Sequence, residues 1–72
     1  MSRIEDIADR LAVEALDLEE RLDDDGIVRR VAEAIAGSSP TMEETFLTAV
    51  RIRRGERRAR DLLERLGARK AP

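Results

Sequence analysis

Residues 4–22 read IEDIADRLAVEALDLEERL, and this stretch decides the expected fold class. Its apolar side chains recur every three or four residues, which is the period of one face of an α-helix. The members of this apolar stripe are Ile4, Ile7, Leu11, Ala15, Leu18 and Leu22. On a helical wheel they fall within an arc of about 80°. The stretch predicts an amphipathic helix over about 3–23, with Ser2 and Glu5 forming a capping box at its start.

Two more helices are expected after the acidic turn Asp23–Gly26. The first covers about 25–36, with the acids of the turn at its N-terminus and Gly37 as the C′ residue that ends it. The second begins with Ser39 as N-cap and Pro40 as its first residue, which are favoured residue types at those positions. It covers about 40–66, and 67–72 are predicted to form a flexible C-terminal tail.

The third stretch carries two apolar faces that point in different directions. Met42, Phe46, Ala49 and Val50 form the first face, with Phe46 as a core anchor. The second face comprises Ile52, Gly55, Ala59, Leu62, Leu63 and Leu66. The centres of the two faces lie about 140° apart on one helical wheel. The stretch is either one continuous helix or two helices broken at Gly55, and we favour the continuous form because no proline intervenes.

The amino-acid composition excludes most catalytic mechanisms and most metal sites. The 72 residues include no Cys, His, Trp or Tyr, so disulfides, thiolate metal sites and histidine-dependent catalysis are absent. The acids Asp23–Asp25 do not start a calcium loop, because Ala34 stands where an EF-hand needs glutamate. No apolar run is long enough for a membrane helix. We therefore expect a non-enzymatic cytoplasmic protein with no cofactor and no metal, and the excess of Arg over Lys suggests a bacterial source.

Small size favours self-association. Ten of the thirty apolar residues are alanine. A chain this short, without a disulfide or a structural metal, rarely buries enough apolar surface to be stable alone. The expected fold is therefore all-α: one domain over 1–66, forming a three- or four-helix antiparallel bundle completed by homodimerisation. The oligomer or partner interface is expected at the second face of the third stretch. Within it, Gly55 and Ala59 permit close helix approach, although Gly55 is equally explained as a tolerated glycine or a helix end.

Charge is unevenly distributed along the chain. Residues 1–25 carry three arginines against ten acids, whereas residues 51–72 carry nine basic against three acidic residues. One hypothesis is self-complementarity, in which the first helix and the C-terminal helix pair antiparallel, within one chain or across a dimer. Another is docking to an acidic protein. A third is nucleic-acid contact through an arginine stripe, as in a transcriptional or phage packaging accessory protein. The members of this stripe are Arg51, Arg54, Arg58, Arg65 and Arg69.

The main functional hypothesis is a small adaptor or regulator that acts through protein–protein contacts. The alternative is the nucleic-acid accessory protein, which the acidic overall balance and the lack of stacking aromatic residues make less favoured. No resemblance to a known family supports either hypothesis.

Overall fold

The structure, a computed structural model, describes residues 3–69. It consists of α1 (Arg3–Leu22), α2 (Ile27–Ala36) and α3 (Pro40–Ala68), and these residues contain no β-strand. The predicted all-α class is confirmed. The expected cap residue Ser2 and residues 70–72 of the expected tail lie outside the described part of the chain.

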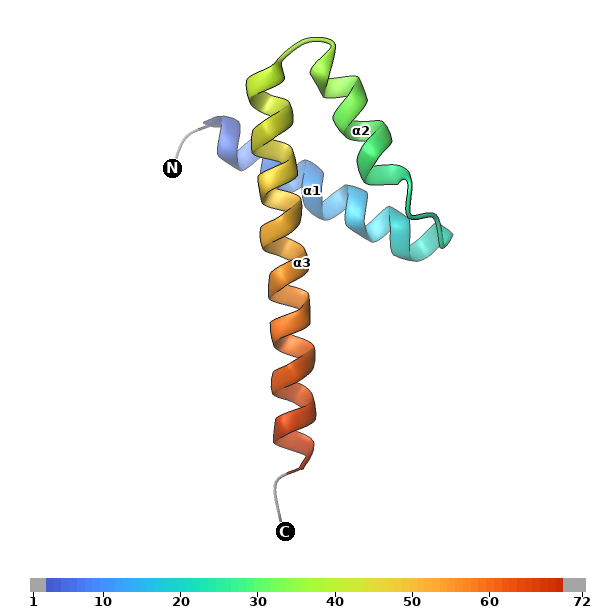
Figure 1. Ribbon diagram of the computed structural model, residues 1–72, viewed down its shortest axis with the longest axis vertical. Coiled ribbons are helices and arrows are strands. Elements are labelled where there is room, and N and C mark those ends of the chain that lie inside the picture. The colour runs from blue at the N-terminus through green and yellow to red at the C-terminus, as the bar shows by residue number, and fades with distance from the viewer. Residues whose placement is uncertain (1–2, 70–72) are drawn as a thin grey trace.

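The three helices meet only around the first half of α3 (Figure 1). α1 crosses behind α3, α2 returns toward the start of α3, and the second half of α3 extends away from both. The extents of 55 × 30 × 13 Å describe a flat, elongated molecule. Its radius of gyration is 14.9 Å, against about 11 Å for a compact domain of this length. α1 and α3 therefore cross, and they do not lie antiparallel along a common seam.

The buried core is small and rich in alanine. Its members are Ala8, Ala12, Ala15, Leu16, Val28, Ala32, Phe46, Ala49 and Val50. Five of these nine are alanine, so the helix backbones approach closely and Phe46, with no exposed surface, fills the space between them. The prediction of Phe46 as a core anchor is confirmed.

The buried face of α1 differs from its predicted apolar stripe. Ala8 and Ala12 are fully buried, whereas Ile4 and Leu22 at the two ends of the stripe are 43% and 59% exposed. The centre of the buried face lies about 80° from the centre of the stripe on the helical wheel. The physical reason is close packing: α1 contacts both α2 and α3, and small side chains allow that approach. The small size of the alanine side chains, and not the greater hydrophobicity of Ile4 and Leu22, therefore decides which face of α1 is buried.

The turn between α1 and α2 is made by Asp23. Its φ of 52° is left-handed, and the N–H groups of Asp23 and Asp24 donate to the carbonyls of Glu20 and Glu19, as in a Schellman cap. Gly26 has φ −98° and precedes α2, which begins at Ile27 and not at 25. Gly37 directly follows the last residue of α2, as predicted, but its backbone angles are right-handed and not the left-handed ones typical of a C′ glycine.

α3 begins as predicted and runs without interruption through Gly55. The hydroxyl of Ser39 accepts a hydrogen bond from the N–H of Met42 at 3.1 Å, and Pro40 is the first helical residue. Residues 67 and 68 belong to the helix, so the predicted tail begins too early. The continuous form follows because glycine costs only about 1 kcal/mol in a helix interior and its neighbours are good helix formers.

Glu19 links all three helices, which the sequence did not reveal. Its carboxylate accepts a hydrogen bond from the N–H of Val28 at 2.9 Å, in the first turn of α2. The other carboxylate oxygen lies 3.3 Å from the Arg54 guanidinium on α3. The Glu19 side chain is only 12% exposed. It therefore takes the N-capping role that was expected of Asp23–Asp25.

We expect Glu19→Ala to lower the free energy of unfolding by about 1–2 kcal/mol, because it removes a helix cap and an ion pair together. Glu19→Gln is the matched control, since its amide oxygen can still accept from Val28 while the ion pair with Arg54 is lost. The decrease in the free energy of unfolding for Glu19→Gln should be less than half of the decrease for Glu19→Ala. Urea unfolding followed by circular dichroism measures both, and equal losses would show that the cap contributes nothing.

Candidate interaction surface

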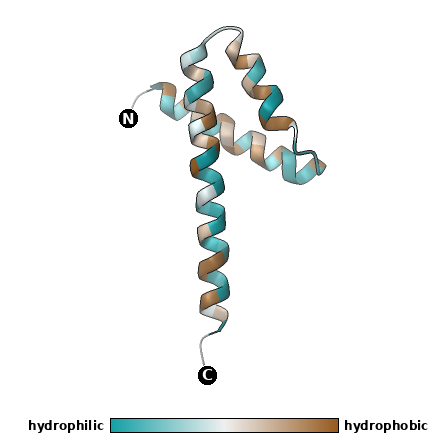
Figure 2. Ribbon diagram, viewed as in Figure 1, coloured by the Kyte–Doolittle hydropathy of each residue, from teal (hydrophilic) through white to brown (hydrophobic). Residues whose placement is uncertain are grey.

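The last part of α3, from residue 58 onward, is exposed along its whole length. Residues 58–69 are all exposed, and Leu62, Leu63 and Leu66 remain 47%, 66% and 48% accessible. Figure 2 shows brown, hydrophobic bands near the C-terminal end of α3, below a mostly hydrophilic stretch of the same helix. The expected interface residues Ile52, Gly55 and Ala59 are exposed as well. All six expected residues therefore lie on one uncovered helix face, which its own chain does not bury.

Ion pairs join the acidic α1 to the basic α3 within one chain. Arg57 lies 2.9 Å from Asp17 and 4.0 Å from Glu20, while Arg53 donates two hydrogen bonds to Asp9. The charges of the two helices are thus complementary inside the monomer. Because these side chains are half-exposed or exposed, the ion pairs are screened by solvent and add little to stability.

The predicted arginine stripe is divided between two roles. Arg54 pairs with Glu19, whereas Arg51, Arg58, Arg65 and Arg69 are exposed and form no ion pair with any residue in the range 3–69. The arginines that pair most extensively with other side chains are Arg53 and Arg57, which lie outside the stripe. Four guanidinium groups therefore remain on one side of α3 with no acidic partner in the described chain.

The Asp9–Arg53 pair displaces the pKa of both groups. The Arg53 N–H groups, one of them 2.8 Å from Asp9, lower the pKa of Asp9 below its ordinary 3.8, and Asp9 raises the pKa of Arg53 in return. The hydrogen bond from Arg60 lowers the pKa of Glu56 below 4.5. Both acids are therefore held ionised in the folded chain.

Stability is expected to fall in acid. Because the folded-state pKa values of Asp9 and Glu56 lie below their unfolded values, the pairs stabilise above about pH 4 and lose this contribution as pH falls further. The melting temperature should therefore change little between pH 7 and pH 5 and drop toward pH 3. Asp9→Asn should melt lower at pH 7 and show a smaller acid-induced drop. An undiminished drop would mean that other carboxylates control acid sensitivity.

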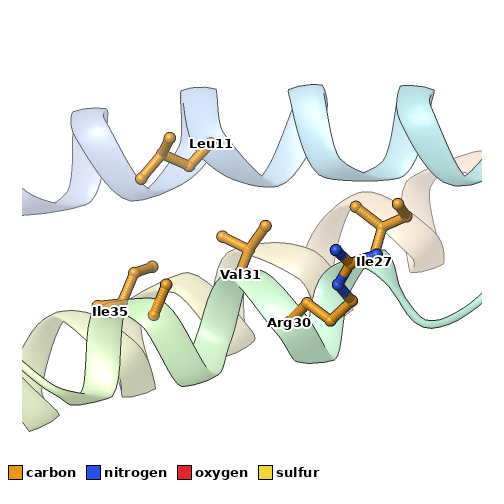
Figure 3. A pocket seen from close by; sticks show the side chains of 6 residues that line it. Leu11, Ile27, Arg30, Val31 and Ile35 are labelled. Atoms are coloured by element: carbon orange, nitrogen blue, oxygen red, sulfur yellow. The ribbon is translucent and has the colours of Figure 1, made fainter.

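An apolar hollow lies between α1 and α2 (Figure 3). Its volume is about 510 Å³, and Leu11 on α1 faces Ile27, Val31 and Ile35 on α2 across it. Arg30 on α2 also lines the hollow and brings a positive charge to its wall. The hollow collects part of the predicted α1 stripe and the apolar side of α2 into a second surface that could receive an apolar side chain.

A groove between the start of α1 and the first half of α3 was missed in the sequence. One hollow of about 190 Å³ is lined by Glu5, Asp9, Thr45, Thr48, Ala49 and Ile52. A neighbouring hollow of about 390 Å³ adds Ile4, Thr41 and Glu44. Extending the second apolar face backward in steps of three and four leads from Ile52 to Thr48 and Thr45. The spacing could have found them, but threonine is not counted as apolar.

Comparison with known proteins gives no relative. No family model, no curated protein and no solved structure matches the chain. Among the described residues no cluster of three potential ligands is placed to hold a metal ion. None of the three helices is long and apolar enough to cross a membrane. The arguments for function therefore rest on the surfaces described above.

Proposed function

We propose that this protein is a non-enzymatic cytoplasmic adaptor or regulator that self-associates as a dimer and binds other proteins. The observation that carries the proposal is the uncovered leucine face of α3, formed by Leu62, Leu63 and Leu66. Contiguous apolar patches on a small soluble chain are typical of interaction sites. Complete burial of one leucine side chain contributes about 1.5–3 kcal/mol, so covering three supplies a substantial driving force.

The projecting helix itself supports this proposal. Beyond Arg57, α3 makes no ion pair with α1 or α2 among the described residues, and about twelve residues extend without side-chain packing. Isolated helices of fewer than about 12–15 residues are marginal in water. A partner on the leucine face would stabilise this segment. The two groups with lowered pKa values, Asp9 and Glu56, are half-exposed members of ion pairs, which favours a binding role over catalysis.

Light scattering after gel filtration tests self-association. The native chain should elute with twice its mass of 8.1 kDa, and Leu62→Asp should elute as a monomer because it places a charge within the apolar face. Ala68→Asp is the matched control, since it adds the same charge to the opposite side of the same helix end. A native chain of monomeric mass throughout the micromolar range contradicts the proposed self-association.

Nucleic-acid binding is the second candidate, supported by the four arginines without acidic partners on one side of α3. Gel-shift assays at low and moderate salt test it, because binding through phosphates weakens steeply as salt rises. Arg58→Glu/Arg65→Glu should abolish the shift. Arg29→Glu/Arg30→Glu is the control, with the same charge change on exposed positions of α2. No shift of the native chain at low salt discards this function.

A further inference from the structure

One continuous face follows α3 from its first turns to its projecting end. Its members are Thr45, Thr48, Ile52, Gly55, Ala59, Leu62, Leu63 and Leu66. They fall within an arc of about 100° on the helical wheel, and none belongs to the buried core. The upper part of this face, Thr45 to Ile52, borders the groove beside α1. The lower part, from Ala59 onward, carries the exposed Leu62, Leu63 and Leu66. This single surface therefore combines a groove with threonine and acidic side chains beside α1 and an exposed leucine patch at the projecting end of α3.

The charges beside this face have opposite signs at its two ends. Glu5 on α1 and Glu44 on α3 border the groove near the start of α3, together with Asp9, whose charge is already paired with Arg53 of its own chain. Arg65 and Arg69 stand beside the leucines at the lower end, exposed and without an acidic partner in the range 3–69. A second copy in the opposite direction places its basic end against this acidic groove. A parallel copy places the two basic ends side by side and is opposed by repulsion.

We propose that a second copy of this chain binds along this face in the antiparallel direction, so that each projecting leucine end lies in the partner's groove. This inference rests on the self-association proposed above and names its surface. The register that best matches the two halves sets Gly55 against the partner's Ala59. Ile52 then faces the partner's Leu62, and Thr48 faces the partner's Leu66. Ala59, Leu62 and Leu66 thus meet positions of the same face, whereas Leu63 lies opposite the partner's Arg51, at the border of the face.

Gly55 gives this register a physical reason. A side chain added at Gly55 would meet no atom of its own chain within 4 Å, so nothing in the monomer needs a glycine there. Glycine nevertheless destabilises a helix interior relative to alanine. Close approach of a second helix at Gly55, against the small Ala59 of the partner, accounts for a residue that the monomer does not use.

The hollow between α1 and α2 is the competing site for the leucine end. It is apolar and large enough to receive a side chain, but Arg30 lines its wall. An incoming helix that carries Arg58, Arg65 and Arg69 would bring like charges together there. The groove beside α1 has acidic borders, which favours it as the site for the same helix end.

Disulfide trapping tests the register, because the chain contains no native cysteine. Thr48→Cys and Leu66→Cys are prepared as separate variants, and light scattering under reducing conditions establishes the mass of each. On mild oxidation, a mixture of the two variants should form a covalent dimer. Each variant alone should not, because identical positions lie about 27 Å apart in the antiparallel register, and a disulfide needs Cα atoms within about 7 Å.

The outcomes separate this inference from the proposed function. Covalent dimers from the mixture alone support the antiparallel register. Efficient trapping of Leu66→Cys with itself indicates a parallel dimer and overturns the inference, while self-association stands. A dimeric mass without any trapping places the interface elsewhere, as in the α1–α2 hollow, and also overturns it. A monomeric mass for the native chain overturns both proposals.

A glycine substitution gives an independent measurement. Gly55→Leu should retain or raise helicity in circular dichroism, since its own chain leaves open space at that position. The dissociation constant of the dimer should rise at least tenfold, because the bulky side chain separates the two helices. Gly67→Leu is the matched control, for its position is equally open but lies off the face. Equal dissociation constants for Gly55→Leu and the native chain overturn the proposed close approach at Gly55.

Discussion

Replacing Phe46 by alanine is expected to lower the free energy of unfolding by about 3–5 kcal/mol. The phenyl ring is fully buried, and five of the eight other buried core residues are alanine, whose short side chains cannot move inward to fill the space. A domain of this length has a total free energy of unfolding of about 4–11 kcal/mol. The variant should therefore be largely unfolded at 37 °C, as measured by the loss of its helical circular dichroism signal.

Phe46→Leu is the control for this substitution. Leucine keeps most of the apolar volume, so the expected loss is about 1–2 kcal/mol and the chain should remain folded at 25 °C. Urea titrations of both variants give the two values. If Phe46→Ala unfolds at the same urea concentration as the native chain, the core described here is not the one that stabilises the protein in solution.

Enlarging Ala12 should also be strongly destabilising. Ala12 has no exposed surface, and it belongs to the alanine face through which α1 approaches its neighbours. A leucine at this position must displace a helix, which costs about 1–3 kcal/mol. For a chain of this size each 1 kcal/mol corresponds to a fall of about 4–8 °C in melting temperature.

Ala34→Leu is the matched control for Ala12→Leu. Ala34 is exposed on α2 and lines the open hollow, so the added side chain has space and the expected change is within about 0.5 kcal/mol. Thermal melting followed by circular dichroism compares the two variants. Equal melting temperatures would indicate that α1 does not pack through its alanine face.

The elements of the fold could be predicted because their determinants are local. Ser39 and Pro40 specify the start of α3 through a side-chain cap and a fixed φ, and both residues act in the structure as expected. The face of Phe46, Ala49 and Val50 could also be identified, since its spacing is purely helical. Local rules therefore identified three helices and one face of the core.

The arrangement of the helices could not be predicted, because it depends on size and on long-range pairing. Ile4 and Leu22 of α1 are large and apolar yet exposed, whereas Ala8 and Ala12 are fully buried, since close crossing favours the smaller residue. Glu19 had no local signature, for its carboxylate binds an N–H nine residues later in the chain. The groove at Thr45 and Thr48 requires α1 to lie beside α3, which no periodicity shows.

The unequal packing of α3 has a consequence for hydrogen exchange. One unbroken helix runs from the core to the projecting end, so its amide protons share the same backbone geometry but not the same protection. Amides near Phe46 should exchange only through opening of the whole domain, while those beyond Arg58 should exchange through fraying of the last turns. Raising the protein concentration should slow the exchange of the amides beyond Arg58 and leave the exchange of those near Phe46 nearly unchanged. Comparing the exchange rates of these two groups of amides in one helix therefore measures whether its outer half is covered by a partner.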